Sequence, residues 1–201
     1  MRTDTKRDDV LKRELDDILA KIETALGKRP RDDARPPEET FGTDADKALD
    51  REVFNRHKHE RLVIDYFDSP KAAQRWVDAL GDAIKRDLLT PNGLKWDDRF
   101  AVALSVQGAN LRPYEAGSTW PIERKVWVDA MQPPVYVAAT LAHEYLHTTQ
   151  ETFISNKQAH GPEFAAGLNA MGLVGPATAS IPGPKFEEWF KQHAPKPEEF
   201  E

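Results

Sequence analysis

The chain contains no cysteine among its 201 residues. This absence excludes disulfide bridges, a cysteine-ligated zinc finger and a cysteine nucleophile together. Long hydrophobic runs are missing as well: the N-terminal stretch lacks the apolar segment of a secretory leader, and no run approaches the length of a membrane span. We therefore expect a soluble, cytoplasmic protein with no membrane partner.

Concentrated positive charge is equally scarce. The net charge is −6, and residues 1–98 mix twenty basic with twenty-three acidic side chains. From residue 99 to 133 the only bases are Arg99, Arg112, Arg124 and Lys125. This mixing is typical of a solvated surface, and the sequence has no basic stripe of the kind that a dedicated nucleic-acid binder carries. Neither a nucleic-acid partner nor the oligomeric state follows from these residues.

Composition suggests one hydrophobic core with extensions, because 39% of the residues are hydrophobic, 31% are charged and fifteen are prolines. Apolar residues from Val10 to Leu26 recur at three- and four-residue steps, which predicts an amphipathic helix within residues 1–28. A charged, proline-rich linker follows over 29–45. We expect the folded domain over 46–175 and an irregular C-terminal tail over 176–201.

The predicted elements give an α+β fold. Helices are expected over 44–67, from Pro70 to a turn at 91–93, over 134–152 and over 162–171; strands are expected over 100–106 and 125–130, with a loop over 115–118. The strand over 125–130 could pair with an extended peptide at an open edge. His57 and His59, two residues apart, are expected at the surface. In the tail, Phe186, Trp189 and Phe190 are expected to dock on the domain. A tail that lies near the cleft could restrain substrate entry.

The most informative stretch is the sequence LAHEYLH over residues 141–147. Two histidines four residues apart lie on one face of a helix, so His143 and His147 can bind one metal ion, with Glu144 beside them. A catalytic zinc ion takes three protein ligands and keeps a fourth position for water. A third ligand must therefore come from elsewhere in the chain.

His160 is the candidate for that third ligand. It precedes Gly161-Pro162, a signal for a turn and the start of a helix, and could reach the metal from the N-terminal end of the following helix. Glu163 is the alternative, as in zinc enzymes whose third ligand is a glutamate. We prefer His160 because imidazole suits zinc. Glu163 could then act in the second shell, where it would hold a ligand or a substrate group, or it could simply be favoured by the helix dipole in the first turn of its helix.

The sequence HEYLH with a downstream HGPEF resembles the SprT-like zinc metallopeptidases of the zincin fold, over about residues 46–175. The resemblance implies that His143, His147 and His160 are zinc ligands and that Glu144 is the catalytic acid and base. Two features of many relatives are absent here: a C-terminal cysteine zinc ribbon, and the basic surface of members that cleave DNA-crosslinked proteins.

We therefore expect zinc-dependent hydrolysis of protein or peptide substrates, by an endopeptidase rather than an exopeptidase. Zinc lowers the pKa of its water from about 15.7 toward about 7, and Glu144 takes the proton as the water attacks a peptide carbonyl. Tyr114 and Tyr136 are candidate oxyanion donors, whereas Tyr145 is expected to pack into the core. Two alternatives stay open: a zinc-held interaction module without activity, and a nucleic-acid-associated repair protease.

Overall fold

The computed structural model describes residues 44–106, 108–112, 115–149 and 159–200 of the chain. The expected helix over residues 1–28 and most of the linker over 29–45 lie outside this part of the chain, as does Tyr114. Asp44 and Ala45, the last two residues of the expected linker, belong instead to a helix. The linker prediction is therefore wrong at its C-terminal end.

Helices and strands are both present, so the α+β class is confirmed. The helices are α2 (Asp44–His57), α3 (Pro70–Ile84), α4 (Pro134–His147), α6 (Pro162–Ala170) and α7 (Pro184–His193), with short turns η3 (Val63–Asp65), η4 (Lys85–Leu89) and η5 (Pro197–Phe200). The strands are β1 (Ala101–Ser105), β2 (Gly117–Trp120), β3 (Lys125–Asp129), β4 (Leu173–Val174) and β5 (Ile181–Pro182). None of the helices in the described ranges combines the length and the apolar character that crossing a bilayer requires.

The main sheet has three strands in the order β1-β3-β2. β1 runs parallel to β3 and β2 runs antiparallel to it. Because β3 is paired on both sides, the expectation that residues 125–130 offer an open edge is wrong. The expected loop over 115–118 is also wrong from Gly117 onward, since hydrogen bonding to β3 draws Gly117–Trp120 into the sheet.

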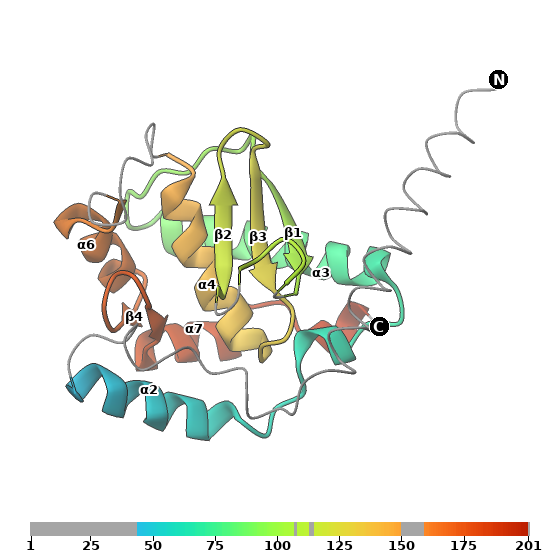
Figure 1. The fold of residues 1–201 in the computed structure, drawn as a ribbon, viewed down its shortest axis with the longest axis horizontal. Helices are drawn as coiled ribbons and strands as arrows, with labels where there is room; N and C mark the ends of the chain where they lie inside the picture. Colours follow the sequence, from blue (N-terminus) through green and yellow to red (C-terminus); the bar gives the residue numbers. More distant parts are fainter. Residues whose placement is uncertain (1–43, 107, 113–114, 150–158, 201) are drawn as a thin grey trace.

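Helices α3 and α4 pack on the sheet, as Figure 1 shows. α3 begins as predicted: Pro70 lies in its first turn, and the Ser69 hydroxyl accepts a hydrogen bond from the Ala72 amide. Val126 and Val128 of β3 are fully buried in the same core as both helices. This core fixes α4, the helix that carries the histidine motif, against the sheet.

Helix α2 ends at His57, so the prediction of a helix over 44–67 is wrong beyond that residue. Residues 57–60 are all polar, and no apolar face continues through them to extend the packing. The chain then passes through the short turn η3, where Val63 is fully buried. Val53 of α2 is fully buried as well.

The C-terminal segment is structured, so the prediction of an irregular tail over 176–201 is wrong. β4 and β5 form a two-stranded antiparallel ladder, and residues 184–193 form α7. The expected docking of the aromatic residues is confirmed: Phe186 is fully buried, Trp189 is nearly so, and Phe190 packs against the same core. The indole nitrogen of Trp76 on α3 donates to the Pro195 carbonyl at 3.0 Å, which ties this segment to the domain.

His57 connects the C-terminal end of α2 with α7. Its Nδ1 lies 2.7 Å from a carboxylate oxygen of Glu60, and its Nε2 lies 3.0 Å from one of Glu187 on α7. Its side chain is 15% exposed, which corrects the expectation that it is a surface residue, whereas His59 is exposed as expected. The Glu60 hydrogen bond, opposed by burial and reinforced by Glu187, raises the pKa of His57 above its ordinary value of 6.5.

Because protonated His57 is favoured in the folded state, its contribution to stability is fully present below pH 6.5 and is lost as the pH rises through the raised pKa. We expect His57→Gln to lower the free energy of unfolding by about 1 kcal/mol at low pH and by less at high pH. Chemical denaturation at pH 5.5, 7 and 9 measures this, with His59→Gln as the matched control. A loss that is constant across this range would contradict the assignment.

Candidate metal centre

Helix α4 begins where the sequence predicts it, but the predicted helix over 134–152 is wrong at residues 148 and 149, which form a turn. Pro134 occupies its first turn after Pro133, no glycine interrupts it, and it ends at His147. His143 and His147 are separated by one turn and project from the same face, as the i, i+4 spacing requires. His147 is buried, so the motif lies partly inside the protein rather than on an open surface.

The third histidine reaches this face from the turn before α6. The Nε2 atom of His147 lies 3.1 Å from Nε2 of His143 and 3.1 Å from Nε2 of His160. Candidate ligand atoms of the three residues all lie within 4.8 Å of one another. Three histidines, 143, 147 and 160, are therefore positioned to hold one metal ion, as predicted.

The donor set also fits the size of a metal ion. With metal–nitrogen bonds of about 2.0–2.1 Å and tetrahedral angles, ligand nitrogens should be about 3.3 Å apart. The two Nε2–Nε2 separations of 3.1 Å are close to this value. Small shifts of the rings would therefore be enough to accommodate the ion.

The ring of Phe164, in the first turn of α6, contacts all three imidazoles. Its ring stacks on His147 at 4.4 Å between centroids, and it meets His143 and His160 edge-on at 5.0 and 5.1 Å. Its side chain is nearly buried. The sequence predicted only that Phe164 lies on the apolar face of its helix. Its position in HGPEF, four residues after His160, is the signal that could have placed it beside the histidines.

Burial lowers the pKa of His143 well below its ordinary value, and the neighbouring imidazoles of His147 and His160 lower it further. The neutral imidazole, which is the form that binds a metal, is thereby favoured. The Nδ1 atom of His143 lies 2.8 Å from the Ser180 hydroxyl oxygen. Ser180 is not recognisable as a site residue from the sequence, because no motif surrounds it.

Glu144 is buried on the side of α4 that meets β2. One of its carboxylate oxygens accepts a hydrogen bond of 2.7 Å from the Thr119 hydroxyl. Burial raises its pKa to about 7, an effect that the Thr119 hydrogen bond opposes and the charge of Glu115 reinforces. At position 117, a Cβ atom would lie 2.5 Å from Thr140 and 3.0 Å from Glu144, so only glycine lets β2 come this close.

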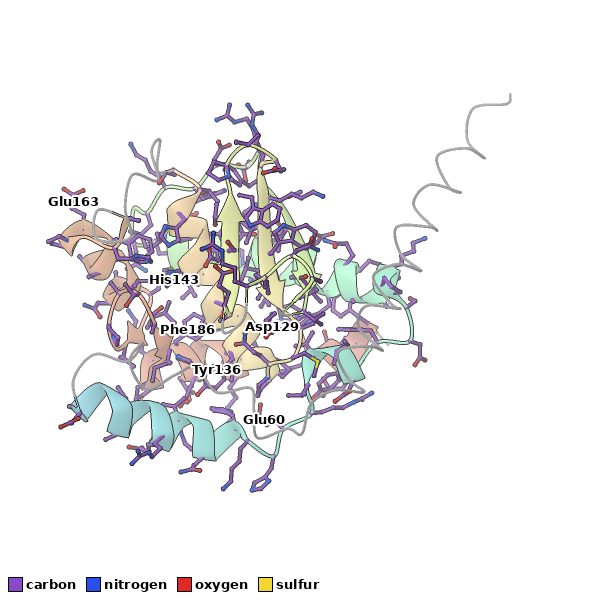
Figure 2. All side chains as sticks on the ribbon, in the orientation of Figure 1. Glu60, Asp129, Tyr136, His143, Glu163 and Phe186 are labelled. Carbon is purple, nitrogen blue, oxygen red and sulfur yellow. The ribbon has the colours of Figure 1, made fainter. Side chains whose placement is uncertain are left out.

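Other predicted site residues lie elsewhere. Glu163 lies in the first turn of α6, where it is exposed and extends away from His143, as Figure 2 shows. The described residues therefore give no support to the second-shell role expected for it. Tyr136 precedes His143 by two turns, roughly 10 Å along α4, and its ring packs against that of His57, so its position does not support the role of oxyanion donor. Tyr145 is buried, as expected.

No family model matches the chain, and searches of curated proteins and of solved structures find no match either. The geometry of the three histidines is therefore the basis for inferring a function.

We expect the protein to bind one divalent metal ion per chain and His160→Ala to weaken that binding more than about 100-fold, beyond the 10–100-fold typical of second-shell changes. Glu163→Ala, three residues away, should leave the affinity unchanged. Elemental analysis and competition with a chelator measure both effects. If Glu163→Ala weakened binding and His160→Ala did not, the third ligand would have been misassigned.

Proposed function

We propose that this chain is a zinc metallopeptidase of the SprT-like zincin type, which hydrolyses peptide bonds with Glu144 as general base. The observation that carries the proposal is the convergence of three imidazoles, two of them on α4, together with a buried carboxylate on the same helix as these two. His143, His147 and His160 would hold the metal. Glu144 follows the first of these ligands directly in the sequence.

Zinc suits this donor set better than other common divalent ions. Three neutral imidazoles without a carboxylate among them favour a borderline-soft cation over magnesium or calcium, which prefer oxygen ligands. When bound, zinc supplies a Lewis acid that brings the pKa of water toward about 7. Three protein ligands leave a fourth position for that water.

The role of Glu144 follows from its surroundings. Thr119 holds one carboxylate oxygen, so the side chain cannot rotate freely, and the other oxygen is available to take a proton from the attacking water. A pKa of about 7 suits a group that first accepts this proton and then delivers it to the leaving amine near neutral pH. The positive charge of a bound metal would favour the ionised form that accepts the proton.

Substrate binding is assigned to the edge of β2 rather than to residues 125–130. β2 ends the strand order of the sheet, and its outer edge is unpaired within the described part of the chain. An extended peptide could add to this edge as a further strand beside Thr119 and Glu144. A substrate peptide that pairs along an open edge need not present its own N- or C-terminus, and this favours an endopeptidase.

The two alternatives are less well supported. A zinc-held interaction module has no need of a buried carboxylate beside its ligands, and burying Glu144 costs free energy. A repair protease would be expected to carry a basic surface, but Arg99, Arg112 and Lys85 pair with acidic residues. Hydrolysis of peptides without nucleic acid is therefore the function that these residues favour.

We expect Glu144→Gln to keep metal affinity within a few fold and to lower the hydrolysis rate at least about 100-fold, because a general base contributes about 10²–10⁴-fold. Cleavage of casein or of a peptide library, with and without chelator, measures the rate. Glu163→Gln makes the same chemical change at an exposed site and serves as the control.

Three outcomes separate the functions. Full activity in Glu144→Gln would remove the proposed base. Metal binding with no hydrolysis of any substrate by the unmodified chain would favour the interaction module. Hydrolysis that occurs only when DNA is added would favour the repair protease.

A further inference from the structure

The Ser180 hydroxyl contacts the metal centre from a distant part of the chain. Its oxygen lies 2.8 Å from Nδ1 of His143, although the two residues are 37 positions apart. On the other side of the same ring, Nε2 lies 3.1 Å from Nε2 of His147. The two nitrogens of His143 thus have separate partners: one faces the histidine cluster and the other faces Ser180.

We infer that Ser180 is a positioning residue of the metal centre, whose hydroxyl oxygen accepts the Nδ1 proton of His143 and thereby directs the Nε2 lone pair at the metal. This inference rests on the metal-binding part of the proposed function and is independent of hydrolysis. A neutral imidazole carries one proton on either nitrogen, and only the Nδ1-protonated form offers Nε2 as a ligand. A fixed acceptor beside Nδ1 therefore selects both the tautomer and the ring orientation.

The backbone around Ser180 is built to hold its hydroxyl in place. The next residue, Ile181, is buried and pairs with Val174 in the β4–β5 ladder. The amide of Ala179 donates to the Pro176 carbonyl at 2.9 Å, which closes the turn that precedes Ser180. Gly175 begins this turn with φ of 90°, a conformation that suits glycine. Ser180 thus lies between a closed turn and a buried strand.

A second close contact holds the two ends of the β4–β5 hairpin together. The Gly183 amide donates to the Gly172 carbonyl at 3.1 Å, and a Cβ atom at position 183 would lie 2.6 Å from that same oxygen. Gly172 itself has φ of 87°. The two ends of the hairpin therefore approach each other more closely than residues with side chains would allow.

A hydroxyl also differs chemically from the carboxylate that often accepts this proton in metal sites. A carboxylate would make the imidazole more electron-rich, whereas a neutral oxygen orients the ring with less donation. A metal ion held by His143 would then keep more of its positive charge for polarising water. Ser180 would thus orient His143 without reducing the Lewis acidity of that ion as much as a carboxylate would.

The test compares variants of the full chain. Ser180→Ala should weaken Zn²⁺ affinity about tenfold or more, within the range typical of second-shell partners. Ser180→Thr, which keeps the hydroxyl, should restore affinity to within a few fold. Thr178→Ala removes an exposed hydroxyl from the same turn and should change nothing. Affinity is measured by competition with a chromogenic chelator, alongside the unfolding midpoint of the metal-free protein.

A measurement on the unmodified chain covers the case in which Ser180→Ala fails to fold. In the zinc-loaded protein, nitrogen-15 NMR should show His143 bound through Nε2, with an Nδ1 proton protected from exchange with water. Binding of zinc through Nδ1 of His143 would overturn the inference, as would equal affinities for Ser180→Ala and Thr178→Ala. Weaker binding in Ser180→Ala together with an absence of peptidase activity would support the inference while refuting the proposed function.

Discussion

The close approach of three imidazole nitrogens is the constraint on which this structure depends. The Nε2 atom of His147 lies 3.1 Å from the Nε2 atoms of both His143 and His160. At this distance the nitrogen lone pairs repel each other unless a proton or a cation lies between them. Packing must therefore hold the helices together. Gly167 of α6 lies so close to Leu146 of α4 that a Cβ atom would be 3.1 Å from its side chain. Close helix contact brings the third histidine within reach, and a metal ion bound between the three nitrogens would relieve the repulsion.

The carboxylate of Glu144 depends on a second close approach, between β2 and α4. Gly117 removes the side chain that would keep the strand away, and Thr119 then reaches the Glu144 carboxylate. Burial alone would favour the protonated form of Glu144, and this hydrogen bond partly restores the ionised one. The strand is thus both the orienting support of the proposed base and the edge on which a substrate would lie.

Local sequence patterns were sufficient for the features that depend on neighbours along the chain. The i, i+4 spacing predicted the shared face of His143 and His147, and the turn signal after His160 predicted a ligand at the start of a helix. Patterns failed where partners are distant. Gly117–Trp120 is short and begins with glycine, so only pairing with β3 reveals it as a strand. His57 and Ser180 likewise acquire their roles from residues 130 and 37 positions away.

The C-terminal segment links the stability of the domain to the geometry of the metal centre. Phe186 fills the core, the Pro195 carbonyl accepts from Trp76, and Ser180 contacts His143 within the same segment. A ligand that binds only the folded state stabilises that state, and with it every element that must be ordered for the ligand to bind. A metal ion held by His143 would therefore stabilise the β4–β5 hairpin through the contact between Ser180 and His143. By the same linkage, a packing defect around Phe186 would weaken metal binding without changing any of the three histidines.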